Sequence, residues 1–360
     1  MSLVPVDAVD LLRRLDEFDA VIDARSEDEY ALDHLPGAVN WPTLDNEQRH
    51  VVGSTYKQVN PFEARKMGAA MAARNIARHI EERAFDKPRS WRPLVYCWRG
   101  GQRSGSLSLV LDQIGFRVHI VQGGYKAFRA ALVADTERLA EQFEYQVVCG
   151  TTGSGKTRLL HALGRAGAQV LDLEALAHHR SSVLGAIPGL PQPSQKAFDT
   201  RVWEVLRRLD PARPVFVESE SRKVGNVAVP IALMEAMRSR GHCLNLELPD
   251  TERVDLLMED YDFFVRDTEA FCARLDALTE IRGKAVVQAW KSAVREGRLA
   301  SVVQDLLTQH YDPVYLQSMQ RNFRNFGKAR TLSPADHSAQ AMDALAATLE
   351  LGRRAQPQTA

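Results

Sequence analysis

The first third of the chain alternates short apolar runs with segments whose apolar residues have helical spacing. The runs FDAVIDAR (18–25), PLVYCW (93–98) and RVHIVQGG (117–124) are bounded by polar residues or glycines, as buried strands are. Between the last two, SGSLSLVLDQIG (104–115) has the period of a helix. Strands that alternate with helices predict an α/β domain with a largely parallel sheet.

Two helix signals help to delimit this first domain. Ser26 followed by Glu29 is a capping-box signature, which predicts a helix start immediately after the first strand. The segment 125–144 has apolar residues at i, i+4 spacing and is expected to be a connecting helix. We therefore divide the chain into a first domain of residues 1–136 and a second domain of residues 137–360.

The alternation of strand and helix signals starts again in the second domain. From about residue 250 onward, long amphipathic runs replace it, so the C-terminal part is expected to be mainly helical. The second domain is thus predicted to be a parallel-sheet domain with a helical C-terminal part. Its expected strands lie within 145–150, 168–175, 214–221 and 242–249, and its expected helices within 156–167 and 231–241.

Composition excludes several classes of protein. The chain has 360 residues, of which 45% are hydrophobic and 26% charged, as is ordinary for a folded protein of two domains. No apolar stretch has the length of a signal peptide or a membrane span, so we expect a cytoplasmic protein without a membrane partner. The four cysteines lack the spacing of a metal site, and we expect free thiols and no bound metal.

The segment GTTGSGKT (150–157) satisfies the pattern G-x-x-x-x-G-K-[ST] in full. It follows an apolar strand and precedes a helical pattern, which is the context that a phosphate-binding P-loop requires. Glycines let the backbone turn its N–H groups toward phosphate oxygens, and the lysine adds a point charge. The motif predicts a phosphate or diphosphate site, but it does not predict what the phosphate is attached to. The predicted binding residues are Gly150, Gly153, Ser154, Gly155, Lys156 and Thr157.

Carboxylates close two of the strands in this domain. Asp172 follows one apolar run, and Glu218 and Glu220 close another. Ligands of such sheets bind at the carboxyl ends of the strands, where each of these groups could orient a magnesium ion or a water molecule. The alternative is ordinary polarity at the end of a strand.

A second glycine-rich loop follows the strand at 93–98. Cys97 and Arg103 fit the pattern C-x5-R, with Arg99 and two glycines between them. Backbone amides, a helix N-terminus and guanidinium groups near the sulfur would favour the thiolate, so we predict a nucleophilic cysteine with Arg99 and Arg103 as catalytic partners. The pattern allows either a phosphatase-type site or a sulfur or selenium carrier. The other three cysteines, in apolar or helical runs, are predicted to be structural.

Two basic segments are candidates for contacts with nucleic acid, although 46 basic and 46 acidic residues leave the chain without net charge. The helix-like segment 64–83 and the segment RNFRNFGKAR (321–330) combine cations with apolar or aromatic residues. The alternative is a solvated helix face and a small core around two phenylalanines. The candidate phosphate contacts are Arg65, Lys66, Arg74, Arg78, Arg321, Arg324 and Lys328.

Several motifs together resemble a known family. The first domain resembles a rhodanese domain, and the chain as a whole resembles the tRNA 2-selenouridine synthase family, in which a rhodanese domain precedes a P-loop domain. Where the family pattern leads us to expect a glycine after Arg180, the chain has Ser181. The rhodanese motifs are VIDARSEDEY (21–30), DHLPGAVNWP (33–42), YCWRGGQRS (96–104) and VQGGYKAFR (121–129), and the further motifs are 60–79, the P-loop, 171–182, 191–198, 215–225 and HYDPVY (310–315).

The resemblance implies a fold and an activity. The fold is α/β, with an N-terminal rhodanese-like domain followed by a P-loop NTPase-like parallel-sheet domain with a helical C-terminal part. The family replaces the sulfur of the wobble 2-thiouridine of tRNA with selenium from selenophosphate, through an S-geranyl intermediate made from geranyl diphosphate. Cys97 would carry the selenium, and the P-loop would hold the diphosphate leaving group.

Partners and cofactors follow from the same resemblance. The implied partner is tRNA, with Trp98 as a candidate for stacking near the reactive base. A selenophosphate-producing enzyme is a further candidate partner. We expect no tightly bound cofactor, with Mg²⁺ left open.

Two other activities remain as alternatives. The first is a rhodanese-type sulfurtransferase fused to an ATP-dependent kinase or ATPase. The second is a nucleotide-gated binding protein with a degenerate rhodanese fold, against which the intact Cys97 loop counts.

Overall fold

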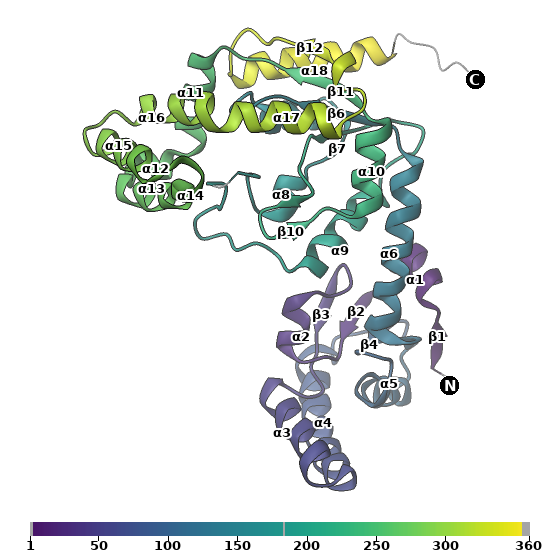
Figure 1. Ribbon diagram of the computed structural model, residues 1–360. Coiled ribbons are helices and arrows are strands. Elements are labelled where there is room, and N and C mark those ends of the chain that lie inside the picture. The colour runs from purple at the N-terminus through teal and green to yellow at the C-terminus, as the bar shows by residue number, and fades with distance from the viewer. Residues whose placement is uncertain (1–2, 183, 355–360) are drawn as a thin grey trace. The chain divides into compact units, whose positions relative to one another are not determined.

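The protein contains two five-stranded parallel sheets, each with helices on its faces, and a short antiparallel pair formed by β9 (Lys223–Val224) and β10 (Val227–Ala228) (Figure 1). The structure is a computed structural model that describes residues 3–182 and 184–354. By its contacts, the chain divides into a first unit, Met1–Thr136 with Pro193–Glu204, and a second unit, Glu137–Gln192 with Val205–Ala360. The α/β class expected from the alternating pattern is confirmed.

The first unit contains a five-stranded sheet in the order β1-β5-β4-β2-β3. All its neighbouring strands are parallel, as expected for strands joined by helical crossovers. The central strand β4 is buried along its whole length, because helices cover both faces of the sheet. The strands are β1 (Val4–Val6), β2 (Ala20–Asp23), β3 (Ala38–Asn40), β4 (Pro93–Tyr96) and β5 (His119–Val121).

Helices surround this sheet and include a long helical hairpin. The predicted capping box at Ser26 and Glu29 is present and begins α2. The hairpin joins α3 to α4, which pack against one another along their length. The helices are α1 (Ala8–Arg14), α2 (Glu27–Leu32), α3 (Asn46–Gln58), α4 (Pro61–Arg83), α5 (Gln102–Ile114) and α6 (Gly124–Gln142).

The segment Pro193–Glu204, most of it in α9 (Gln195–Leu206), belongs to the first unit although it lies far along the chain. Polar side chains fix it there. The Thr200 hydroxyl donates to Asp33 Oδ2 at 3.1 Å, and Arg129 Nη2 donates to Asp199 Oδ2 at 2.8 Å. The sequence pattern gave no sign of this return, because it depends on contacts between distant residues.

The second unit contains another five-stranded parallel sheet, in the order β12-β11-β6-β8-β7. Helices α7 and α18 pack against each other and supply Leu159, Leu163 and Met342 to its core. The strands are β6 (Tyr145–Cys149), β7 (Gln169–Leu171), β8 (Val215–Glu218), β11 (His242–Leu246) and β12 (Arg330–Leu332). Its flanking helices are α7 (Lys156–Arg165), α8 (Leu173–Ala177), α10 (Ile231–Arg240) and α18 (Ala339–Arg354).

The predicted helical C-terminal part is present, with a core of its own built around Phe271, Leu275, Trp290 and Leu306. One element there was not expected: β12 returns to the sheet and pairs with β11. Among the described residues, no helix has both the length and the apolarity needed to cross a bilayer. The helices are α11 (Asp250–Asp260), α12 (Asp262–Arg266), α13 (Thr268–Leu275), α14 (Thr279–Arg282), α15 (Lys284–Arg295), α16 (Leu299–Asp305), a π-helical segment (Leu306–Tyr311) and α17 (Asp312–Asn322).

Candidate functional site

The Cys97 loop connects the end of β4 to the start of α5 and is built on glycines. Gly100 has φ of 67°, a conformation that other residues adopt only at a cost. Gly124 lies so close to the loop that a Cβ atom there would be 2.3 Å from the Cys97 carbonyl oxygen. The glycines of the VQGG turn therefore allow the turn to close directly against the cysteine loop.

Cys97 lies at the bottom of this loop and is only 3% exposed. The Ser104 hydroxyl, on the first turn of α5, donates a hydrogen bond to Cys97 Sγ at 3.1 Å. The Cys97 carbonyl accepts from the backbone N–H of Tyr125 at 2.8 Å, which fixes the backbone beside the sulfur. The sulfur thus has a hydrogen-bond donor and the N-terminus of α5 beside it. The thiol is therefore largely shielded from solvent in this conformation.

The two arginines of the loop have different environments. Arg103 forms a close ion pair with Glu29, with Nη1 and Oε2 2.5 Å apart, whereas the Arg99 side chain is exposed. Burial opposes ionisation of Glu29, but the hydrogen bonds and charges of Arg103 and Arg49 outweigh it and lower the pKa of Glu29 to about 2. The charge of Arg103 is therefore balanced within the protein, and Arg99 is the loop arginine that remains exposed to an incoming anion.

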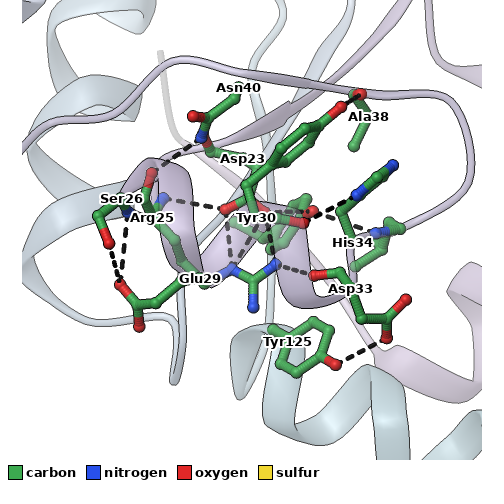
Figure 2. A network of polar contacts seen from close by, with 12 residues as sticks. Asp23, Arg25, Ser26, Glu29, Tyr30, Asp33, His34, Ala38, Asn40 and Tyr125 are labelled. Atoms are coloured by element: carbon green, nitrogen blue, oxygen red, sulfur yellow. Dashed lines mark hydrogen bonds and ion pairs between the residues drawn. The ribbon is translucent and has the colours of Figure 1, made fainter. Parts of the chain in front are cut away.

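A buried network lies at the base of helix α2 (Figure 2). The Arg25 guanidinium is 1% exposed and pairs with Asp23, with Nη2 and Oδ2 2.6 Å apart. The Tyr96 hydroxyl also donates to Asp23 Oδ2 at 2.7 Å, and the Tyr125 hydroxyl donates to Asp33 Oδ2 at 2.7 Å. Burial opposes the charge on Arg25, but its hydrogen bond with Asp23 raises the pKa of the guanidinium. Tyr96 directly precedes Cys97, and the Tyr125 N–H donates to the Cys97 carbonyl, so the network ties the cysteine loop to α2.

The P-loop of the second unit connects β6 to α7 and depends on three glycines with positive φ. Gly150, Gly153 and Gly155 have φ of 148°, 79° and 86°. A Cβ at Gly150 would lie 2.3 Å from Ser154 Oγ, so the fully buried Ser154 side chain packs behind the loop. Its hydroxyl has no hydrogen-bond partner among the described residues. This backbone conformation is the kind that directs amide groups toward an anion.

Lys156 and Tyr315 both hold the first residue of the P-loop, Gly150. Lys156 Nζ donates to the carbonyl oxygens of Gly150 at 2.7 Å and Thr151 at 3.3 Å, so one of its three donors remains for a ligand. The Tyr315 hydroxyl accepts from the Gly150 N–H at 2.7 Å. Arg253 donates to the Thr152 carbonyl at 2.8 Å and pairs with Asp312. The loop is thus preorganised by the helical part of the unit.

Four carboxyl groups gather beside the P-loop. Asp172 caps α8 through the N–H of Ala175 at 2.7 Å, and Glu218 accepts from the N–H of Glu174 at 2.7 Å. Glu174 itself accepts from the Thr157 hydroxyl of the P-loop at 3.1 Å. Burial, followed by the charge of Glu220, raises the pKa of Glu174 to about 8.

Burial and neighbouring carboxylates also raise the pKa of both Glu218 and Glu220. Glu174 therefore retains its proton near neutral pH. Within residues 3–182 and 184–354, no group of three or more His, Cys, Asp or Glu side chains is arranged to hold a metal ion.

Ser181, at the position where the family pattern led us to expect glycine, has φ of 44°. This left-handed conformation is costly for a residue with a Cβ atom. The nearby His178 also has positive φ, at 53°. The backbone therefore has the conformation that glycine would adopt more easily, although the chain has serine there.

The candidate nucleic-acid contacts lie on the surface of each unit. The predicted cations of α4 and of the segment 321–330 are all exposed, and Lys66 is paired with Glu63 at 2.8 Å. Phe323 is buried at 4% exposure, so the alternative of a small core explains it, and it does not offer a face to a base. Trp98 is half-buried, with its ring centroid 5.4 Å from that of Tyr125.

Some residues that shape these two loops were not singled out from the sequence. Glu29 was recognised only as a helix cap, and Ser104 and Glu174 only as parts of matched motifs. Tyr315 lies in the motif HYDPVY, so a signal for it was present, but its role depends on a contact 165 residues away along the chain.

Two family descriptions match successive parts of the chain. Residues 7–131 match the family description "Rhodanese-like domain", and residues 143–342 match "tRNA 2-selenouridine synthase AAA domain". A rhodanese-related protein of known structure from Thermoplasma volcanium is 18% identical, with a TM-score of 0.23, and the match covers 35% of this chain and 89% of that one.

Three curated relatives named tRNA 2-selenouridine synthase are similar along most of the chain. The protein from Nitrosomonas europaea is 37% identical over 67% of this chain and 63% of its own length. Those from Nitrosomonas eutropha and Sulfurovum sp. are 33% and 32% identical, each over 84% of this chain and over 88% and 89% of their own lengths. The predicted succession of a rhodanese-like and a P-loop domain is confirmed, and the chain belongs to the tRNA 2-selenouridine synthase family.

Proposed function

We propose that this protein is an enzyme that modifies tRNA by converting 2-thiouridine at the wobble position into 2-selenouridine. The observation that carries the proposal is the match of the family description to residues 143–342, together with relatives that bear the name of this activity. The intact Cys97 loop and P-loop supply the two kinds of chemistry that the reaction requires.

The finer proposal is that the P-loop serves the geranylation step. The thiocarbonyl sulfur of 2-thiouridine attacks C1 of geranyl diphosphate, a carbon–sulfur bond forms, and the carbon–oxygen bond breaks to release pyrophosphate. The loop amides and Lys156 would bind and stabilise that leaving group. If Mg²⁺ accompanies the diphosphate, the Thr157 hydroxyl and the Glu174 carboxyl, 3.1 Å apart, are oxygen donors of the type that it prefers. The metal would neutralise charge on the phosphates.

Selenation is proposed to depend on the Cys97 loop. The S-geranyl group is a better leaving group than the free sulfur of the nucleobase, so a selenium nucleophile can replace it at C2 of the base. Cys97 is proposed to bind and orient the selenium of selenophosphate. The selenium stays at the selenide level and forms a bond to C2 as the C2–S bond breaks and geranylthiol leaves, and water cleaves the P–Se bond to give phosphate. The exposed Arg99 and the N-terminus of α5 are suited to bind the anionic donor.

The two steps can be separated by mass spectrometry of tRNA nucleosides from a deletion strain complemented with variants. Cys97→Ser should remove 2-selenouridine and leave geranylthiouridine, whereas Lys156→Ala should remove both. Cys272→Ser, the same change at a cysteine in the core of the helical part, should restore both nucleosides. Unchanged nucleosides after gene deletion, with thiosulfate sulfurtransferase and ATPase activity in vitro, would instead support the alternative of a fused sulfurtransferase and kinase.

Binding of tRNA is proposed to use the exposed cations on each unit. In the second unit, Arg238 lies beside Arg321 and Arg222, whose positive charges add to burial in lowering the pKa of the Arg238 guanidinium. Such a concentration of like charges is favourable beside phosphates. Neutralising Arg321, Arg324 and Lys328 together should weaken tRNA binding and reduce the slope of log affinity against log salt concentration. An unchanged slope would exclude this surface.

A further inference from the structure

An apolar cavity lies in the helical part of the second unit, next to the P-loop. It is bounded by α11, α12, α13, α16 and the π-helical segment, and by residues from the P-loop and from the region after α8. Of the described residues that line it, none is charged and none carries a side-chain amide. The lining residues include Thr152, Leu257, Phe264, Val265, Val303 and Leu307.

The cavity and the phosphate cradle share part of their walls. Thr152 belongs to the P-loop and also lines the cavity. Leu257 lines the cavity as well, and a Cβ built on Gly153 of the P-loop would lie 3.1 Å from the Leu257 side chain. Arg253, one turn earlier on α11, fixes the Thr152 carbonyl. An anion in the loop and a group in the cavity would therefore be separated by little more than one layer of side chains.

This juxtaposition favours one kind of ligand. Thr152, Ser182, Tyr261 and Tyr311 are the lining residues that carry hydroxyl groups. A nucleoside presents more ribose hydroxyls and base-edge groups than these could pair, and burying the rest against Leu, Val and Phe would leave them without hydrogen bonds. A hydrocarbon chain needs no such partners and gains free energy from every carbon that it removes from water. The diphosphate ester of an apolar alcohol matches both halves of the site.

We propose that this cavity receives the isoprenoid chain of a prenyl diphosphate and that its walls determine which chain length is accepted. The proposal rests on the proposed function, in that the diphosphate would occupy the P-loop, but it adds a subsite and the residues that shape it. The cavity volume is about 60 Å³. This is smaller than the ~150 Å³ cavity that accepts benzene, so a ten-carbon chain enters only as the walls move apart. Met258 and the π-helical segment in those walls are suited to such movement.

The test measures binding of three probes to the full-length protein by calorimetry, with ATP as a comparison ligand. The probes are inorganic pyrophosphate, dimethylallyl diphosphate and geranyl diphosphate. The wild type should bind geranyl diphosphate more than about tenfold more tightly than pyrophosphate, because the chain is buried. Val303→Phe, which fills the cavity from a half-buried position, should remove that preference and leave the affinity for pyrophosphate unchanged. Val286→Phe is the matched control, because Val286 is exposed on α15 and does not line the cavity.

A second variant keeps the proposal testable if Val303→Phe does not fold. Val265 lines the cavity but is 42% exposed, so Val265→Phe should be tolerated and should weaken geranyl diphosphate binding in the same direction. Equal affinity of the wild type for pyrophosphate and geranyl diphosphate would overturn the proposal. It would also be overturned if both variants kept the wild-type preference for geranyl diphosphate over pyrophosphate. Tighter binding of ATP than of geranyl diphosphate, lost in Val303→Phe, would also overturn it and would indicate a nucleotide site.

Lys156→Ala distinguishes failure of the proposal that the cavity binds the isoprenoid chain from failure of the proposal that the P-loop binds the diphosphate. If this variant loses affinity for pyrophosphate while the geranyl chain adds nothing in the wild type, the cavity proposal fails and the P-loop keeps its diphosphate role. If this variant binds all three probes normally while Val303→Phe weakens only geranyl diphosphate, the P-loop role fails and the apolar subsite stands.

Discussion

The ion pair between Arg103 and Glu29 allows a quantitative test of how the cysteine loop is held. The proposed change is Glu29→Gln, which removes the charge and keeps a side chain that can complete the capping box of α2. The two side chains are 19% and 17% exposed, so water screens the pair only in part. Loss of the charge leaves Arg103 without its balancing carboxylate.

The expected loss of folding stability in Glu29→Gln follows from the pKa of Glu29. At about 1.4 kcal/mol for each pKa unit, the fall from 4.5 to about 2 corresponds to about 3 kcal/mol of folding stability at neutral pH. Because the pKa is lower in the folded state, this contribution is complete above pH 4.5 and is lost as the pH falls from 4.5 toward 2. The glutamine can still accept a hydrogen bond, so we expect the variant to lose about 2 to 3 kcal/mol at pH 7.

Urea unfolding of the full-length protein, followed by tryptophan fluorescence, measures this loss. Four of the five tryptophans lie in the first unit, so the signal reports mainly on its unfolding. The difference between wild type and Glu29→Gln should shrink as the pH is lowered from 5 toward 3. Glu63→Gln removes a carboxylate from an exposed ion pair on α4 and should cost less than about 1 kcal/mol. An equal loss for Glu29→Gln at pH 7 and pH 3 would refute the electrostatic reasoning.

Three further predictions concern stability. Asp23→Asn leaves the buried Arg25 without its counterion and should cost about 3 to 5 kcal/mol in urea unfolding; a loss below about 1 kcal/mol would contradict the buried network. Glu174 has a raised pKa in the folded state, so its contribution to stability should decline as the pH rises from 4.5 to about 8, and Glu174→Gln should flatten the thermal stability of the second unit across that range. Ser181→Gly should stabilise the protein by about 1 kcal/mol in thermal unfolding, because φ there is 44°, whereas Ser182→Gly should give no such gain.

Much of the fold could be predicted because its signals are local. The strands around PLVYCW and YQVVCG, the capping box of α2 and the P-loop glycines each reflect the backbone conformation or burial of consecutive residues. The aromatic residues among the cations of segment 321–330 were a less reliable signal of contact with bases, since Phe323 is buried. An aromatic residue between cations has the same local pattern whether it packs in a core or faces solvent.

Local sequence patterns were enough to predict the two α/β units, the two glycine-rich loops and the family, because periodicity and glycine positions are properties of neighbouring residues. The partners of those loops became known from the three-dimensional packing. Glu29 reaches Arg103 across 74 residues, Tyr315 reaches Gly150 across 165, and the residues 193–204 return to the first unit. Such contacts depend on how whole helices and strands pack. The chain has many charged and aromatic residues that could form a contact of each kind, and the packing determines which residue forms it.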